Sequence, residues 1–320
     1  MTEPLMAIGN AGVSIISQEV AEKARKKNIS PSLISALESC PARWAADNFV
    51  LRDLLPQEQD NAATRGQLFH KVMEVVFAAA PEERSRAFID SVIPQVIATE
   101  EFIGFEGNDD ALAWLSNAID GYYRMGGNPE KVQVASYSRK GDSEPKLGLE
   151  VFVKGQIGES SRECLGFVDR LTVDQKNEGG IIIEDWKSGA KAKKWNPKTK
   201  SDEGLAEARQ QVNYSMLLRQ DGVKITGARL IYPVAEAMIP VETNDPTFNR
   251  KVVEAVEEAD RALTTMVETN LFEFKPNNFC AWCPLSSICP AAQIGKYAKA
   301  QEAARKQPSI DILAPAFDFV

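Results

Sequence analysis

The hydrophobic pattern of this chain changes period near residues 126–129 (GGNP), and that change limits the folds open to it. Before this break, apolar residues recur at helical spacing over residues 15–27, over 64–79 and onward to about Tyr123. The Ser-Pro pair at 30–31 is typical of a helix start, with serine as the N-cap and proline at the first helical position. The N-terminal part of the chain is therefore predicted to be helical.

After the break, the pattern is that of strands joined by helices. Strands are predicted at residues 148–156, at 164–174, from Ile181 onward, and at 225–233. Helical spacing returns at about 203–220 and 247–269. This order predicts an α/β fold of the mixed α+β kind, in which helices flank a central mixed sheet.

The charge of the chain is unevenly distributed. Overall, 45 acidic residues against 37 basic ones give a formal net charge of −8, which is unusual for a nucleic-acid binder. However, six lysines and no acid lie between Lys187 and Lys200, with Trp195 among them. Such a run alone is usually a solvated loop. Its position beside the motif described below favours a surface that follows a nucleic-acid backbone.

Several enzyme classes are excluded by missing motifs. The chain has a single histidine, which rules out H-E-x-x-H zinc catalysis, and it lacks the H-x-E and P-C-x-x-C pattern of deaminases. No G-x-x-x-x-G-K-[ST] phosphate loop is present. The first twenty residues carry no Lys or Arg, and no apolar run reaches membrane-spanning length. We therefore expect a cytoplasmic protein with no membrane partner.

A short polar motif, Asp185-Trp186-Lys187, ends the isoleucine-rich strand. Because side chains alternate along a strand, Asp185 and Lys187 point the same way. Asp169 follows an apolar stretch in the preceding strand, so pairing of the two strands would let both carboxylates converge on one hard cation. Lys187 can then orient or deprotonate a water, or stabilise charge on a phosphate. A bare D-x-K is more often a buried ion pair, so this interpretation depends on its companions.

Four further residues accompany the motif. His70, the only histidine, lies on a predicted helix, where a histidine is more often structural than a ligand. Gln210 and Tyr214 are four residues apart and share one face of the helix predicted after the lysine run. Glu150 is an acid that interrupts the apolar positions of a strand. Each is unremarkable alone, and their value lies in their combination.

In this order, the residues resemble the RecB-type branch of the PD-(D/E)XK nucleases. The pattern G-x-x-x-H, an isolated Glu, G-x-x-D-R, D-x-K-[ST]-G and Q-x-x-x-Y is met by residues 66–70, Glu150, 166–170, 185–189 and 210–214. The resemblance covers about residues 30–290. That branch includes the nuclease domains of RecB and AddB, iron–sulfur nucleases of CRISPR adaptation, and stand-alone viral and cellular exonucleases. Valine at position 168 replaces the proline of the superfamily's name, as is common in this branch.

The resemblance implies a nuclease that depends on Mg²⁺ or Mn²⁺. By that resemblance His70, Asp169 and Asp185 ligate the cation. Lys187 would be the catalytic lysine, and Glu150 would support the site through a second metal or a water.

The resemblance also implies DNA as the partner. Gln210 and Tyr214 would position DNA or the loop that carries the catalytic lysine. The remaining residues expected to contact DNA are Lys191, Lys193, Lys194, Trp195, Lys198 and Arg170.

Four of the five cysteines form a pattern that indicates metal binding. Cys280, Cys283 and Cys289 give C-x2-C-x5-C, while Cys40 stands alone near the N-terminus. Thiolates bind zinc readily, and C-x2-C is a usual half-site for it. One distant cysteine plus three C-terminal ones resembles the [4Fe–4S] staple of the AddB and CRISPR-adaptation nucleases, so we favour iron–sulfur over zinc. Cys164 has no place in this pattern and is expected in the core.

Taken together, these observations predict a DNA exonuclease acting on single strands or DNA ends in recombination, repair or phage DNA metabolism, with a helicase or recombination protein as partner. The alternatives are a CRISPR-adaptation-type subunit that trims DNA with integrase partners, and an inactive DNA-binding scaffold. An intact set of site residues argues against the scaffold.

The domain organisation is predicted as follows. We expect an N-terminal extension at 1–29, a nuclease domain at 30–290 with a helical insertion at about 80–125 and cluster-binding ends, and a C-terminal helix and tail at 291–320.

Overall fold

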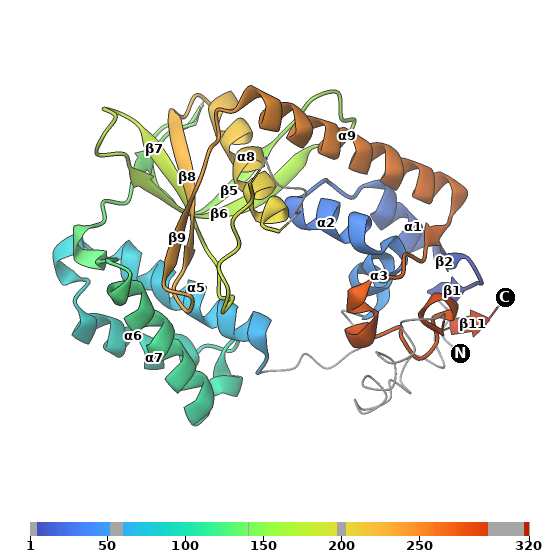
Figure 1. The fold of residues 1–320 in the computed structure, drawn as a ribbon, viewed down its shortest axis with the longest axis horizontal. Coiled ribbons are helices and arrows are strands. Elements are labelled where there is room, and N and C mark those ends of the chain that lie inside the picture. Colours follow the sequence, from blue (N-terminus) through green and yellow to red (C-terminus); the bar gives the residue numbers. More distant parts are fainter. Residues whose placement is uncertain (1–4, 52–59, 140, 197–202, 294–316, 320) are drawn as a thin grey trace. The chain divides into compact units, whose positions relative to one another are not determined.

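The computed structural model describes residues 5–51, 60–139, 141–196, 203–293 and 317–319 (Figure 1). The chain divides into two compact units. One, which we call the sheet unit, comprises residues 58–157 and 165–253. The other, which we call the terminal unit, comprises residues 1–57, 158–164 and 254–320.

A five-stranded mixed sheet forms the centre of the sheet unit. In spatial order its strands are β5 (Leu149–Gly155), β6 (Cys164–Val173), β7 (Ile181–Trp186), β8 (Ile225–Tyr232) and β9 (Ala237–Val241). Strand β7 runs antiparallel to β6 and parallel to β8, while β9 runs antiparallel to β8. A parallel pair needs a crossover, which α8 (Leu205–Gln220) supplies. The mixed sheet flanked by helices that the sequence predicts is confirmed.

Helices cover both faces of this sheet. Those that share the apolar core on one face are α5 (Ala62–Ala78), α6 (Arg86–Ile97) and α7 (Asp109–Arg124). Trp186 of β7 packs there against Phe69 of α5 and Tyr122 of α7, with ring centroids 5.4 and 5.1 Å away. Its neighbour Asp185 points to the opposite face, because side chains alternate along a strand, and there meets Gln210 of α8. The sheet therefore presents its acid to one helical layer and its tryptophan to the other.

The terminal unit contains a small four-stranded sheet in the order β10-β2-β1-β11. Its strands are β1 (Met6–Ile8), β2 (Gly12–Ile15), β10 (Phe272–Glu273) and β11 (Phe317–Phe319). Its helices are α1 (Gln18–Arg25), α2 (Pro31–Ser39) and α3 (Pro41–Ala46). Helix α9 (Pro246–Thr269) begins in the sheet unit and ends in the terminal unit.

The remaining elements are short. They are the strand pair β3 (Ser136–Tyr137) and β4 (Lys146–Leu147), a π-helical turn at Asp47–Leu51, and 3₁₀ turns at Pro81–Glu83, Ile103–Phe105, Pro129–Lys131, Asn278–Trp282 and Pro290–Gln293. Among the described residues, no helix is both long and apolar enough to cross a bilayer.

The longer elements lie where the sequence predicts them. Ser30 caps α2 by accepting a hydrogen bond from the backbone N–H of Leu33 at 3.1 Å, and proline occupies the first turn. Helix α2 ends at Ser39 because Cys40 is extended, with φ −163°, and the next helix starts at once. The sequence does not predict β1, β2, β9 or β10, since strands of two to five residues carry too few alternations. The predicted boundaries at 29 and 290 stay a prediction.

Candidate active site

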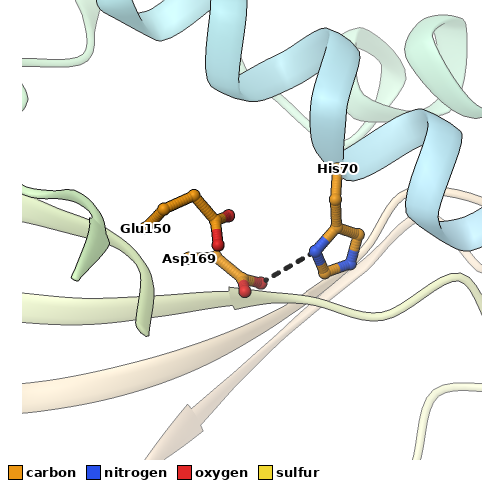
Figure 2. Close-up of side chains that lie close together, drawn as sticks. All are labelled: His70, Glu150 and Asp169. Carbon is orange, nitrogen blue, oxygen red and sulfur yellow. Dashed lines mark ion pairs between the residues drawn. The ribbon is translucent and has the colours of Figure 1, made fainter. Parts of the chain in front are cut away.

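Three side chains from three elements converge in the sheet unit (Figure 2). His70 lies on α5, Glu150 on β5 and Asp169 on β6, and one ligand atom from each lies within 4.8 Å of the other two. The imidazole Nδ1 of His70 is 3.5 Å from Oδ2 of Asp169. Within the part of the chain that the structure describes, this trio is the one group of three or more His, Cys, Asp or Glu gathered so closely. We call it the His–Glu–Asp trio.

The backbone orients the carboxylates of Glu150 and Asp169. Glu150 adopts a left-handed conformation with φ +44°, which an ordinary residue takes only where the surrounding structure enforces it. Oδ2 of Asp169 accepts a hydrogen bond from the backbone N–H of Trp186 at 2.7 Å. That bond crosses from β6 to β7 and fixes the carboxylate at the point where the paired register of these strands ends.

A second group of side chains surrounds the predicted catalytic lysine. Nζ of Lys187 lies 2.7 Å from Oδ2 of Asp185 and donates to Oε1 of Gln210 at 2.9 Å. Nε2 of Gln210 donates to Oδ1 of Asp185 at 3.2 Å and to the hydroxyl of Tyr214 at 3.1 Å. Gln210 therefore connects the aspartate, the lysine and the tyrosine. The role of Gln210 and Tyr214 in positioning DNA or the loop that carries Lys187 stays a prediction.

Burial and then neighbouring charges shift the pKa values within the site. Burial, followed by the charges of Asp169 and Glu74, raises the pKa of Glu150 to about 7. Burial also raises the pKa of Asp185, although Lys187 acts in the opposite direction. For His70, burial lowers the pKa, but Asp169 and then the other acids outweigh it and raise it above the ordinary value. A bound divalent cation would relieve this repulsion, and the oxygen-rich donor set suits one.

The structure thus brings the predicted site residues together in two groups. His70, Glu150 and Asp169 form the trio, whereas Asp185 is held by Lys187 and Gln210. The expectation that Asp185 joins His70 and Asp169, with Glu150 in support, stays a prediction. In this geometry Glu150, rather than Asp185, belongs to the close group with His70 and Asp169. Glu150 has a left-handed backbone that no sequence pattern predicts.

Two motif glycines are explained by close packing in the site. A Cβ at Gly66, one turn before His70, would lie 2.8 Å from Oγ of Ser188. A Cβ at Gly166 would lie 2.3 Å from the ring of Tyr214. These glycines let α5 approach the segment after β7, and let α8 approach β6. Ser188 directly follows the lysine in the sequence motif, but the motif does not predict that Ser188 packs against Gly66.

Replacing Gly166 with alanine is expected to displace the Tyr214 ring and break its hydrogen bond with Gln210. Overpacking of this kind costs about 1–3 kcal/mol of stability. Turnover on DNA should fall by about tenfold, because Gln210 would no longer be positioned to accept the hydrogen bond from Lys187. Thermal unfolding and cleavage rates would measure both effects. Gly227→Ala in β8 is the matched control, since nothing lies within 4 Å of its added Cβ. Equal activity of the two variants would contradict the positioning role.

Arg170 does not lie where a DNA contact requires it. Its side chain is 1% exposed, and Nε donates to Oε2 of Glu184 at 2.6 Å. The guanidinium carbon lies 3.8 Å from the ring centroid of Phe77 and 4.6 Å from that of Trp186. Glu184 is also paired with Arg229 at 2.6 Å. The prediction that Arg170 contacts DNA is therefore corrected: as the neighbour of Asp169 it points to the opposite, buried face.

The lysine run is partly neutralised by nearby acids. Lys191 pairs with Glu203 at 2.6 Å, and Lys193 pairs with Glu207 at 3.0 Å. Lys194 is exposed. The Trp195 ring is stacked on Phe248, with centroids 4.0 Å apart and an interplanar angle of 25°. Lys198 lies outside the described residues. The DNA-binding role of this run stays a prediction.

The four patterned cysteines meet in the terminal unit. Cys40, Cys280, Cys283 and Cys289 all line one pocket. Burial raises the pKa of Cys283 to about 12. Burial also raises the pKa of Cys289, although hydrogen bonds from the backbone of Ala292 and Ala291 act in the opposite direction. Cys164 is fully buried elsewhere in the unit, which confirms its predicted core position.

The mixed sheet, the His–Glu–Asp trio and the adjacent Asp–Lys pair define the class of protein, a metal-dependent nuclease. The chain belongs to the PD-(D/E)XK nuclease superfamily, whose sequence model matches residues 28–290. Members of this superfamily generally use Mg²⁺ or Mn²⁺, and a nuclease binds nucleic acid.

Among solved structures, the crystal structure of SSO0001 is similar over 86% of this chain and 93% of its own length. The two are 13% identical, with a TM-score of 0.33. A comparison with curated protein sequences found no match.

Proposed function

We propose that this protein is a Mg²⁺- or Mn²⁺-dependent DNA exonuclease that acts on single strands or on DNA ends. The observation that carries the proposal is the His–Glu–Asp trio beside an Asp185–Lys187 pair in a PD-(D/E)XK nuclease. The exonuclease mode and the preference for free ends are supported by the resemblance of the motifs to the RecB-type branch.

The residues of the trio fit a hard divalent cation. Two carboxylates and one imidazole are ligands that Mg²⁺ and Mn²⁺ accept. Burial and then neighbouring negative charge raise the pKa of Glu150 to about 7, and a cation would offset that charge. We propose that His70, Glu150 and Asp169 hold the ion, with Asp185 as a further ligand. When bound, such an ion lowers the pKa of water and neutralises charge on the phosphate.

Lys187 is proposed to act as a fixed positive charge. Burial lowers its pKa, but Asp185 outweighs that effect and raises the pKa above the ordinary value, so the side chain stays an ammonium. Asp185 and Gln210 hold Nζ at 2.7 and 2.9 Å. An ammonium held in this way stabilises charge that develops on a phosphate oxygen and orients an attacking water. Burial raises the pKa of Tyr214 to about 12, so its hydroxyl stays protonated while its oxygen accepts a hydrogen bond from Gln210.

We also propose that Cys40, Cys280, Cys283 and Cys289 bind a [4Fe–4S] cluster, with zinc as the alternative. In a tetrahedral zinc site with Zn–S near 2.3 Å, the sulfurs lie about 3.8 Å apart. A four-iron cube holds its thiolates farther apart, because each binds a different iron. These four cysteines line one pocket, which supports a metal group shared by all of them, and the resemblance to the AddB and CRISPR-adaptation nucleases favours the cluster.

The cellular role is proposed from the same resemblance. A free-end exonuclease with an iron–sulfur staple suits recombination, repair or phage DNA metabolism, where a helicase or recombination protein would supply the strand. The cytoplasm, where thiols stay reduced and available to metals, is the compartment proposed.

The test is digestion of one labelled single strand in linear form and as a covalently closed circle of identical sequence. With Mg²⁺ or Mn²⁺, the linear form should be shortened stepwise from its ends, and the circle should survive. Duplex DNA with blunt ends and with single-stranded tails would rank the substrates. Cutting of the circle at the same rate would refute the exonuclease mode, and no cleavage of any form would refute the function.

A further inference from the structure

Two exposed phenylalanines of the sheet unit lie on the strands that carry Glu150 and Asp169. Phe152 on β5 is 39% exposed and Phe167 on β6 is 54% exposed. Their ring centroids are 5.2 Å apart at an interplanar angle of 49°. Their neighbours Val151 and Val153 on β5 are buried, so the strand turns its valines inward and its phenylalanine outward. We call Phe152 and Phe167 the aromatic pair.

Exposed rings of this kind are costly on a strand. Phenylalanine is among the residues most often buried, and an apolar patch on the edge strand β5 invites unwanted pairing with other chains. Isolated exposed apolar residues need no explanation, but two contacting rings form a surface. A ligand with a flat apolar face would cover both.

The position of the aromatic pair identifies that ligand. Phe167 is two residues before Asp169 on β6, and Phe152 contacts Phe167 from the neighbouring strand β5. Burial alternates along β6 from Gly166 to Arg170, with Phe167 and Asp169 on the less buried side. Two residues along a strand span about 6.6 Å, close to two base steps of about 3.4 Å in a stacked DNA strand. A strand with its phosphate at the trio would therefore carry a nearby base to the rings.

We propose that the aromatic pair stacks against a base of an unpaired DNA strand, about two nucleotides from the scissile phosphate. The proposal rests on the function proposed above and names the residues that select single strands. Bases inside a duplex have both faces covered by their neighbours, whereas an unpaired base offers a free face to an aromatic ring. The pair therefore favours single-stranded DNA and frayed ends over intact duplex, whatever the sequence.

The experiment compares Phe152→Ala/Phe167→Ala with Phe167→Trp and a matched control. Met238→Ala is the control, because Met238 is also 39% exposed but lies on β9, the opposite edge of the same sheet. The double alanine variant should raise KM for single-stranded DNA about tenfold for each ring removed, while kcat at saturation stays within about threefold. Phe167→Trp keeps an aromatic ring, so its KM should equal or fall below that of the wild type. Met238→Ala should not change KM.

A binding measurement separates this proposal from the proposed function. In an Asp185→Ala background, 2-aminopurine placed at successive positions of a single strand should be quenched at one or two positions only. That quenching should vanish in the double alanine variant. If KM and quenching are the same with and without the rings, the stacking proposal fails even though the enzyme cuts DNA. If no DNA is cut but the quenching depends on the rings, the nuclease function fails and the stacking site stands.

Discussion

Cleavage of DNA is expected to fall by about a thousandfold or more when Asp169 is replaced by asparagine. Loss of one carboxylate from the His–Glu–Asp trio weakens cation binding, and a bound cation contributes several kcal/mol, or several factors of ten in rate. The fold should persist, because the asparagine carbonyl can still accept the hydrogen bond from the Trp186 backbone. Single-turnover cleavage of a labelled strand, with circular dichroism to check folding, measures both.

The control for this variant is Glu236→Gln. Glu236 is an acid of the same unit whose carboxylate pairs with Arg124 at 2.7 Å, at the surface and outside the trio. Its removal should leave cleavage unchanged, since surface ion pairs contribute little. Wild-type cleavage by Asp169→Asn, in protein freed of contaminating nuclease and titrated with Mg²⁺, would disprove the metal site. Partial rescue by Mn²⁺, which binds imidazole better than Mg²⁺ does, would support it.

The second large effect is expected from Cys280→Ala. Protein purified without oxygen should be brown, and this variant should be colourless, because a cluster bound by four thiolates loses one ligand. A cluster bound by both Cys40 and Cys280 cross-links the chain and closes a loop of about 240 residues. Loss of such a cross-link lowers the free energy of unfolding by about 4 kcal/mol or more. Limited proteolysis should then cut α1 to α3 faster, and the thermal midpoint should drop.

Cys164→Ala is the control for the cluster prediction. Cys164 is a buried cysteine of the same unit that does not line the pocket, so its replacement should keep the colour and cost only a small cavity. Metal analysis distinguishes the remaining outcomes. One zinc per chain in colourless wild-type protein would overturn the iron–sulfur proposal but keep the cross-link. Equal stability of metal-free Cys280→Ala and wild type would overturn the cross-link as well.

The sequence predicts those parts of the fold that depend on local chemistry. Ser30 and the following proline start α2 as the sequence predicts, because capping involves only neighbouring residues. The strand that ends in Asp185 is visible as an isoleucine run closed by polar residues. Lys187 and Gln210 share a hydrogen bond although 23 residues separate them, and only the motif, not the local pattern, suggested their association.

The arrangement of the site depends on longer-range geometry that the sequence does not reveal. Glu150 enters the trio through a left-handed backbone, and no residue type marks that conformation for a glutamate. Strand alternation could have shown that Arg170 faces away from Asp169, but its acceptor Glu184 is fixed only by the register of β6 and β7. The acids that pair with Lys191 and Lys193 lie 12 and 14 residues further on, across a segment whose path the sequence does not fix.

The contacts of Lys187 bear on how much reorganisation catalysis requires. A free lysine side chain has about 2 kcal/mol of rotamer entropy, which is lost when its ammonium is fixed. In this protein Asp185 and Gln210 already fix it, so that entropy is lost during folding rather than during substrate capture. In the proposed mechanism the ammonium is thus preorganised for the phosphate, and binding energy from the DNA strand is left for aligning the scissile bond.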